Sequence, residues 1–219
     1  ALNRYDSETD GWYISKDNGD IERKFWKDDF SVDSSSNYTG DVSSFTWDTA
    51  NKKLIATGVV NTDYIVCNQD ITGLERISAY LNINAANKVN GLIFGYIDSD
   101  NYYSAQLLSY QEGRYRVCRV QSGVVSLIAS QITAVDNTGA TDYKIELIQS
   151  GSDVKFYKNG ILLATIPNVN IGTRIGISGF SKTPEYTLSG EIKELTGYPS
   201  ISYSDDFATD TTERYQAVT

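Results

Sequence analysis

The sequence contains no histidine, no methionine and only three prolines. The absence of histidine excludes the Ser–His and Cys–His nucleophile systems, and with them the usual proton shuttle at neutral pH. Sixteen tyrosines give the chain an aromatic composition that favours β-structure. The composition therefore predicts a β-rich protein without histidine-based catalysis.

Long apolar runs and excess positive charge are also absent. No run of about 18 apolar residues occurs, so we expect no membrane insertion. The N-terminus, ALNRYDSETDGW, lacks the basic and then apolar layout of a signal peptide. A net charge of -9 and a pI near 4.5 exclude nucleic acid as a partner, because its phosphates require a basic face.

The two cysteines, Cys67 and Cys118, stand inside apparent strands and belong to no CxxC motif. Metal binding or thioredoxin-like redox chemistry is therefore not expected. We predict that both are small buried hydrophobes, with a disulfide between them as the alternative.

An internal repeat is the most informative feature of the sequence. DDFSVDSSSNY begins at Asp28, and DDFATDTTERY begins at Asp205. Both segments carry Asp-Asp-Phe, followed in the same register by an aspartate (Asp33 and Asp210) and a tyrosine (Tyr38 and Tyr215). Matches in fixed register indicate a tandem repeat.

The repeat predicts how the chain is divided. Residues 28–198 form one β-sandwich, and residues 199–219 form a linker with the first strand of a following repeat. Residues 1–27 are then a linker or the end of a preceding element. Pro199 interrupts any continuous ladder between the two units.

Apparent strands and turn signals fill the chain from Asp28 to Leu195, and no segment has a sustained helical period of 3.6. The turn at DSDN, residues 98–101, predicts a hairpin. In its expected register, Leu92, Phe94 and Tyr96 lie opposite Leu107, Ala105 and Tyr103 on one apolar face. The pattern predicts an all-β fold, an antiparallel sandwich.

Four stretches resemble a known family, the concanavalin A-like, laminin G-like jelly rolls. They are GLIFGYIDSDNYYSAQLLSYQEGRYRVCRVQSGVVSLIAS, DYKIELIQSGSDVKFYKNGILLATI, GTRIGISGFS and DDFS. The resemblance covers roughly residues 28–195 and implies a concanavalin A-like antiparallel β-sandwich. Since this fold hosts lectins, glycan-binding modules, glycosidases, adhesins and phage tail or capsid parts, it does not by itself decide the function.

Catalysis is not predicted. The resemblance implies that a retaining glycosidase of this fold would carry clustered carboxylates on one strand, as in Glu-x-Asp-x-x-Glu, with two carboxyl groups about 5 Å apart. No such cluster occurs in the sequence.

The resemblance also implies a structural Ca²⁺ where the first and last strands of the sandwich meet. The candidate ligands at that place are carboxylates, the hard oxygen donors that Ca²⁺ prefers: Asp28, Asp29, Glu191 and Glu194. The alternative is that these are solvated edge charges that discourage aggregation between sheets.

A ligand site is predicted on the sheet face turned away from the core. The candidate residues, beside a gap at Gly95, are Tyr102, Ser104, Gln106, Arg114 and Arg116. A tyrosine ring for stacking on a sugar, flanked by amide and guanidinium donors, suits carbohydrate. The alternative is the polar, half-exposed face that any antiparallel sheet presents.

Together these observations predict a non-catalytic carbohydrate-binding or adhesive module from a tandem-repeat protein that is extracellular, on a cell surface or on a virion. Its partners would be a glycan or cell-surface polysaccharide and neighbouring copies of the module, since repetition multiplies weak affinities. The alternative is an architectural module of a virion tail, fibre or capsid decoration, or of a surface filament. A glycoside hydrolase is the third hypothesis.

Overall fold

A computed structural model describes residues 3–6, 11–15, 21–23, 26–56, 63–82, 88–108, 114–132, 142–178, 187–188 and 190–199. These residues form β-strands and two single-turn 3₁₀ helices, η1 (Ser35–Asn37) and η2 (Val42–Ser44). None of the helices in these ranges is long and apolar enough to cross a membrane. The strands are β1 (Asn3–Asp6), β2 (Gly11–Ser15), β3 (Ile21–Arg23), β4 (Trp26–Asp28), β5 (Tyr38–Gly40), β6 (Phe45–Asp48), β7 (Lys53–Ala56), β8 (Tyr64–Cys67), β9 (Leu74–Asn82), β10 (Lys88–Asp98), β11 (Asn101–Leu108), β12 (Arg114–Gln121), β13 (Val124–Ile132), β14 (Tyr143–Ser150), β15 (Asp153–Lys158), β16 (Ile161–Ile166), β17 (Gly176–Ser178), β18 (Thr187–Leu188) and β19 (Gly190–Pro199).

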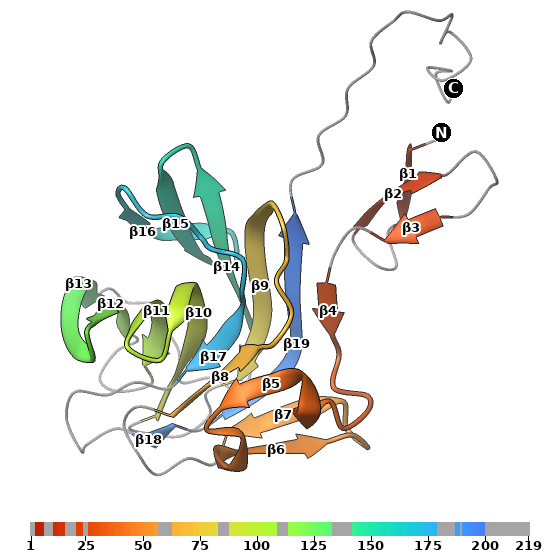
Figure 1. The fold of residues 1–219 in the computed structure, drawn as a ribbon, viewed down its shortest axis with the longest axis horizontal. Coiled ribbons are helices and arrows are strands. Elements are labelled where there is room, and N and C mark those ends of the chain that lie inside the picture. Colours follow the sequence, from red (N-terminus) through yellow and green to blue (C-terminus); the bar gives the residue numbers. More distant parts are fainter. Residues whose placement is uncertain are drawn as a thin grey trace, which may run out of the picture.

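Two sheets pack face to face (Figure 1). The first sheet has the strand order β13-β12-β11-β10-β17-β8-β5, and β18 pairs in parallel with β10. The second sheet has the order β16-β15-β14-β9-β19-β7-β6, and β4 pairs with β19. The predicted fold class, an antiparallel β-sandwich, is confirmed.

The core lies between the two sheets because successive side chains of a strand point to opposite faces. On β11 this alternation directs Tyr103, Ala105 and Leu107 into the core. From the second sheet, Leu147 and Phe156 meet them, and both are fully buried. Truncation of a buried aromatic such as Phe156 to alanine would cost about 3–5 kcal/mol of stability.

The hairpin between β10 and β11 differs in register from the prediction. Leu92 pairs with Ala105, and Phe94 pairs with Tyr103, a shift of two residues. The cause is an irregularity between Phe94 and Asp98, where Gly95 adopts a positive φ of 54° and residues 95–97 bulge out of the ladder. A shift of two keeps Leu92 and Phe94 on their predicted apolar face, which meets the core. Tyr96 was predicted on the same face, but the bulge turns it to the face directed away from the core, where it packs with Tyr64 and Tyr102.

The N-terminal strands β1, β2 and β3 form a three-stranded sheet of their own, separate in its pairing from both sheets of the sandwich. The sandwich begins at β4, where Trp26 to Asp28 pair with Gly197 to Leu195. β19 runs on to Pro199, which lies opposite Leu74 after a last irregularity. The second copy of the repeat, from Asp205, lies outside the described residues.

The two cysteines are buried and free, as predicted. Cys67 belongs to the core between the sheets. Cys118 lies opposite Ser104 in the ladder between β11 and β12, and both side chains lie on the face of the first sheet that is turned away from the core. The two sulfur atoms therefore serve separate packing surfaces.

Candidate functional site

The outer face of the first sheet, which is the face turned away from the core, carries the residues predicted to bind a ligand. Tyr102, Ser104 and Gln106 alternate with the core residues of β11 and so point to this face. Their burial differs from the half-exposed polar face that was the alternative to a ligand site, and it leaves little of these three predicted ligand residues open to a sugar. Tyr102 is 4% exposed, and Ser104 and Gln106 are 0% exposed. They are therefore structural supports of the site rather than contact residues.

Neighbouring strands align these side chains into a polar row, which we define as Ser104, Gln106, Arg116 and Ser178. In the register of the sheet, Ser178 lies opposite Gly91, Gly91 opposite Gln106, and Gln106 opposite Arg116. The hydroxyl oxygens of Ser104 and Ser178 are hydrogen-bonded at 2.5 Å. Gln106 donates from Nε2 to Ser178 Oγ at 3.4 Å and accepts from Arg116 Nε at 2.6 Å. The row ties β11, β12 and β17 together by side chains as well as by the ladder.

Gly91, not the predicted Gly95, leaves the gap in this face. A Cβ atom at Gly91 would lie 2.8 Å from Gln106 Cγ and 2.2 Å from the Ala105 carbonyl oxygen. Any larger residue would therefore displace the Gln106 side chain. Gly95 lies instead in the bulge of β10, with its missing Cβ directed at the Tyr103 ring.

Three tyrosines on the outer face form a second feature, the tyrosine cluster of Tyr64, Tyr96 and Tyr102. Their ring centroids lie 5.4 Å apart for Tyr64–Tyr102 and 6.2 Å apart for both Tyr64–Tyr96 and Tyr96–Tyr102. These separations are those of favourable tilted aromatic pairs. Tyr102 is buried and packs with Val66, Ile93 and Val120, whereas Tyr64 and Tyr96 are half-buried. The cluster thus has a buried base and two partly open rings.

The tyrosine cluster adjoins the polar row because Tyr64 pairs with Ser178 across β8 and β17. On its other side, Gly40 of β5 makes room for the Tyr64 ring. A Cβ at Gly40 would lie 3.1 Å from Tyr64 Cε2 and 2.4 Å from the Tyr64 carbonyl oxygen, and its φ is 104°. A glycine is required here on both counts.

Asp41 lies at the rim of the tyrosine cluster. Its carboxylate Oδ2 accepts from the backbone N–H of Tyr64 at 3.0 Å, and its own N–H donates to the Tyr64 carbonyl at 2.7 Å. Burial, and then the negative charge of Asp41, raises the pKa of Tyr102 to about 12. Burial and a hydrogen bond with Tyr96 raise the pKa of Tyr64 further above the ordinary value. The phenols of Tyr64 and Tyr102 are therefore neutral donors and acceptors at physiological pH.

The other two predicted ligand residues have different outcomes. Arg116 is half-buried and holds Gln106. The side chain of Arg114 lies outside the described residues, although its backbone pairs with Leu108. The sequence analysis did not identify Tyr64, which stands far from β11 in the chain. Its signal was the alternation in DYIVC, which sends Tyr64 and Val66 to one face and Ile65 and Cys67 to the other.

The structure does not bring the four predicted calcium ligands together. Asp28 pairs with Leu195, a core residue, and therefore faces inward. It is 8% exposed, and it accepts from Ser34 Oγ at 2.5 Å, Phe30 N at 2.8 Å and the Tyr38 hydroxyl at 2.9 Å. Asp29 is exposed and accepts from the Ser31 N–H at 3.0 Å.

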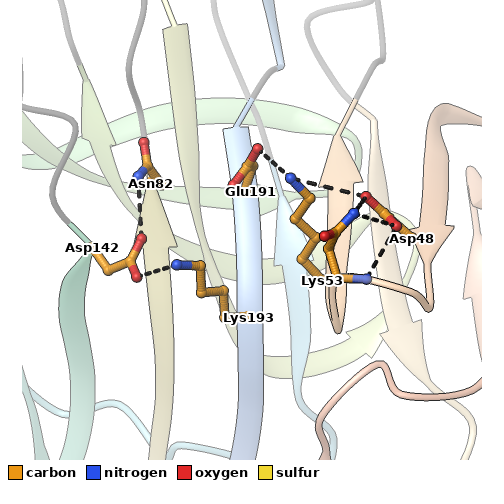
Figure 2. Close-up of polar contacts among 7 residues, drawn as sticks. Asp48, Lys53, Asn82, Asp142, Glu191 and Lys193 are labelled. Carbon is orange, nitrogen blue, oxygen red and sulfur yellow. Dashed lines mark hydrogen bonds and ion pairs between the residues drawn. The ribbon is translucent and has the colours of Figure 1, made fainter.

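Glu191 and Glu194 of β19 lie on the opposite side of the second sheet, because their neighbours Ile192 and Leu195 point into the core. Figure 2 shows Glu191 facing Lys53, whose Nζ lies 2.7 Å from its carboxylate. Glu194 forms an ion pair with Lys27 at 2.8 Å. Within the described ranges no three cysteine or acidic side chains are grouped to hold a metal ion. The sheet therefore separates Asp28 from both glutamates, and each carboxylate has another partner.

Comparison with known proteins identifies the fold and no closer relationship. No protein-family model matches the chain, and no curated protein matches its sequence. Among solved structures, the carbohydrate-binding module CBM66 from Bacillus subtilis is 15% identical with a TM-score of 0.54, over 74% of this chain and 95% of that chain. A Bacillus licheniformis β-glucanase is 9% identical with a TM-score of 0.58, over 80% and 98%. The exoplasmic/lumenal domain of VIP36, in a Ca²⁺/Man2-bound form, is 13% identical with a TM-score of 0.56, over 82% and 88%.

These similarities confirm the concanavalin A-like jelly-roll fold that the sequence resemblance implied. The relation to laminin G-like domains in particular stays a prediction. At such identities the fold is shared by proteins with different activities, so the function has to be argued from the site.

Proposed function

We propose that this sandwich is a non-catalytic carbohydrate-binding module whose contact surface is the tyrosine cluster. The observation that carries the proposal is the packing of Tyr64 and Tyr96, both partly open, on the buried Tyr102. The apolar face of a sugar ring packs on an aromatic ring, and a phenol beside it supplies a hydrogen bond. Two such rings beside a carboxylate provide both kinds of contact.

Buried residues of the first sheet hold the tyrosine cluster in place, which favours specific recognition. Tyr102 and the aliphatic residues around it fix the rings, and the Asp41 carboxylate is held by the Tyr64 backbone. The polar row lies in the same face and links the strands that carry it. A ligand that meets such a surface orders few side chains on binding, and this lowers the entropic cost of the complex.

We propose binding without catalysis because of the side chains on the outer face of the first sheet. The described outer-face positions of β11 and β12 hold Tyr102, Ser104, Gln106, Leu108, Arg116, Cys118 and Val120. None is a carboxylic acid, whereas a glycosidase requires an acid paired with a second carboxylate. Asp41 stands at the rim, bound to a backbone N–H. Binding, not bond cleavage, is the chemistry that these groups support.

The proposal includes tandem repetition, because each repeated residue of the first copy has a definite contact. Asp28 accepts hydrogen bonds within the turn, Phe30 is fully buried, and the Tyr38 ring packs on Trp47. Asp29 and Asp33 accept from the N–H groups of Ser31 and Ser35. The recurrence of this set at Asp205, Asp206, Phe207, Asp210 and Tyr215 supports a second sandwich opening there. Repeated weak sites on one chain would gain avidity on a surface polysaccharide.

A glycan array probed with the whole chain is the test, followed by titration of the best-bound glycan with variants. Tyr64→Ala and Tyr96→Ala should each weaken binding about tenfold, as is typical of an aromatic contact residue. Tyr80→Ala is the matched control, since Tyr80 is a 37% exposed tyrosine on β9 of the other sheet. Tyr102→Phe should keep the affinity, because its role is packing.

Two results would contradict the proposal. Loss of binding in Tyr80→Ala equal to that in Tyr64→Ala would move the site to the second sheet. Release of new reducing ends from the bound glycan, lost in Asp41→Asn, would make the protein a hydrolase.

A further inference from the structure

A pocket of about 540 Å³ opens on a different side of the sandwich, where the two sheets end. β13 is the edge strand of the first sheet and β16 the edge strand of the second, and they lie on the same side in Figure 1. Leu127 and Ile128 of β13 face Ile166, Pro167 and Val169 across the opening. The volume is that of a small-molecule site, and none of the tyrosine cluster belongs to it.

The floor and the outer rim of this edge pocket are aliphatic, and Tyr103, Arg119, Ser126 and Asn168 complete its lining. Ile166 and Val169 form a buried floor, at 1% and 7% exposed, whereas Leu127 and Ile128 at the rim are 57% and 41% exposed. The rim is open because the ladder between β12 and β13 is irregular opposite Val117 and Cys118, so Ile128 is an extra, unpaired residue. Exposed apolar side chains that continue into a buried apolar floor indicate a surface that another apolar group covers.

The described lining of the pocket includes one charged side chain, which is a cation. Arg119 of β12 is exposed, and its strand neighbours are Tyr103 and Ser126. In the described part of the chain, its guanidinium takes part in no ion pair and no side-chain hydrogen bond. Among the described residues that line the pocket none is acidic, although the chain as a whole carries a net charge of -9.

The exposed rim distinguishes this pocket from the tyrosine cluster. Its lining includes one aromatic residue, Tyr103, and the polar Ser126 and Asn168, but the side chains at its open rim are Leu127 and Ile128. A hydrocarbon chain can cover Leu127 and Ile128, and each methylene that it buries there favours binding. A guanidinium at the rim adds charge-assisted hydrogen bonds to a carboxylate.

We propose that the edge pocket binds a free aliphatic monocarboxylate. The carboxylate head pairs with the Arg119 guanidinium, and the hydrocarbon chain lies between Leu127 and Ile128 on one side and Ile166 and Val169 on the other. This site is independent of the proposed carbohydrate site, which lies on the outer face of the first sheet.

The test is an NMR titration of the isotope-labelled chain with octanoate and, separately, with octanol at the same pH, both below micelle formation. Octanoate should shift the amide signals of Arg119, Leu127, Ile128 and Val169 and bind more tightly than octanol. Arg119→Gln should weaken octanoate about tenfold and leave octanol unchanged. Lys52→Gln is the charge-matched control, because Lys52 is an exposed cation on the turn between β6 and β7.

Equal affinities for octanoate and octanol, or an unchanged octanoate affinity in Arg119→Gln, would overturn the proposal. So would shifts confined to other strands. Sedimentation gives an independent check on the occupant. A dimer that Leu127→Asp dissociates and octanoate does not would show that the pocket takes an apolar side chain of a second copy instead.

Discussion

Gln106 and Arg116 lie opposite each other on β11 and β12, and the Arg116 Nε donates to the Gln106 Oε1 at 2.6 Å. Gln106 is 0% exposed, on the face of the sheet that does not meet the core. A buried glutamine that accepts from a guanidinium and donates to Ser178 satisfies both ends of its amide. The pair therefore acts as a structural cross-link between strands that carry the candidate site.

Replacement of Gln106 by alanine should reduce the free energy of unfolding by about 2–3 kcal/mol, because it leaves a half-buried guanidinium without this acceptor. Urea denaturation followed by tryptophan fluorescence measures the change. Gln121→Ala, at the exposed end of β12, is the matched control and should cost less than about 0.5 kcal/mol. Equal losses in the two variants would show that the Gln106–Arg116 bond contributes nothing.

Stability should fall at alkaline pH because of Tyr102. Its pKa is raised to about 12 in the fold, mainly by burial, while the unfolded chain has the ordinary value of 10.0. The contribution is fully present below pH 10 and is lost as the pH rises towards 12, because only the unfolded state then releases the proton. The slope for one such group reaches about 1.4 kcal/mol per pH unit.

Denaturation midpoints at pH 9, 10 and 11 measure this dependence, and Tyr102→Phe should reduce its slope. Tyr80→Phe is the control on the other sheet. If Tyr102→Phe leaves the slope unchanged, another group is responsible for the alkaline loss. Tyr38 would be the next tyrosine to replace, because burial and the negative charge of Asp28 raise its pKa.

Asp28 and Asp29 are adjacent and should differ sharply in their effect on stability. Asp28→Ala removes the acceptor of Phe30, Ser34 and Tyr38 inside the fold, and we expect a loss of about 2–4 kcal/mol. Asp29→Ala removes an exposed acceptor of one backbone N–H and should cost less than about 1 kcal/mol. Thermal or urea denaturation of the two variants gives the comparison. Equal effects would contradict the buried role of Asp28.

A chelator should leave the thermal midpoint of the protein unchanged. Asp28 faces the core, Glu191 is paired with Lys53, and Glu194 is paired with Lys27, so these carboxylates are not arranged around a cation. Differential scanning fluorimetry with EDTA and with added CaCl₂ measures the effect. A midpoint that rises with Ca²⁺ and falls in Glu191→Gln would restore the calcium prediction.

The repeat can be tested by replacing its first copy with the sequence of the second. Writing DDFATDTTERY in place of residues 28–38 keeps Asp28, Phe30 and Tyr38 and replaces the buried Ser34 by threonine, another hydroxyl donor. The other changed positions are exposed or half-buried, so stability should fall by less than about 1 kcal/mol. The same graft with Tyr38→Phe should lose more, because the hydrogen bond to Asp28 is then missing. A graft that does not fold would show that the two segments are not structurally equivalent.

Alternation predicted the face of the side chains in the regular strand β11 and failed for Tyr96, which follows the bulge in β10. Ala105 and Leu107 point into the core and Ser104 and Gln106 point away, as the period of two in β11 requires. The position of Cys67 and Cys118 inside apparent strands, outside any CxxC motif, correctly predicted buried free cysteines. The exact partner of Leu92 was wrong by two residues, because the bulge after Phe94 leaves no trace in the alternation.

The candidate site was only half predictable. Tyr102 lies on β11 and Tyr64 on β8, and the strands β10 and β17 lie between them in the sheet. These four strands come from three separate parts of the chain. The burial of Gln106 depends on groups brought over it by folding, so its sequence neighbours do not reveal it. The separation of the four predicted calcium ligands has the same origin. Which side of the second sheet Glu194 takes is fixed by Leu195 entering the core.

The sequence by itself determined the all-β class, the direction of the side chains along the regular strand β11 and the repeated Asp-Asp-Phe segment, because these depend on local period and composition. Only the tertiary structure decided that Tyr64, Tyr96 and Tyr102 meet, that the four carboxylates are kept apart, and that β13 and β16 enclose a pocket with Arg119 at its rim. The physical reason is that strand order and register join residues distant in the chain, and these are set by the packing of the whole core.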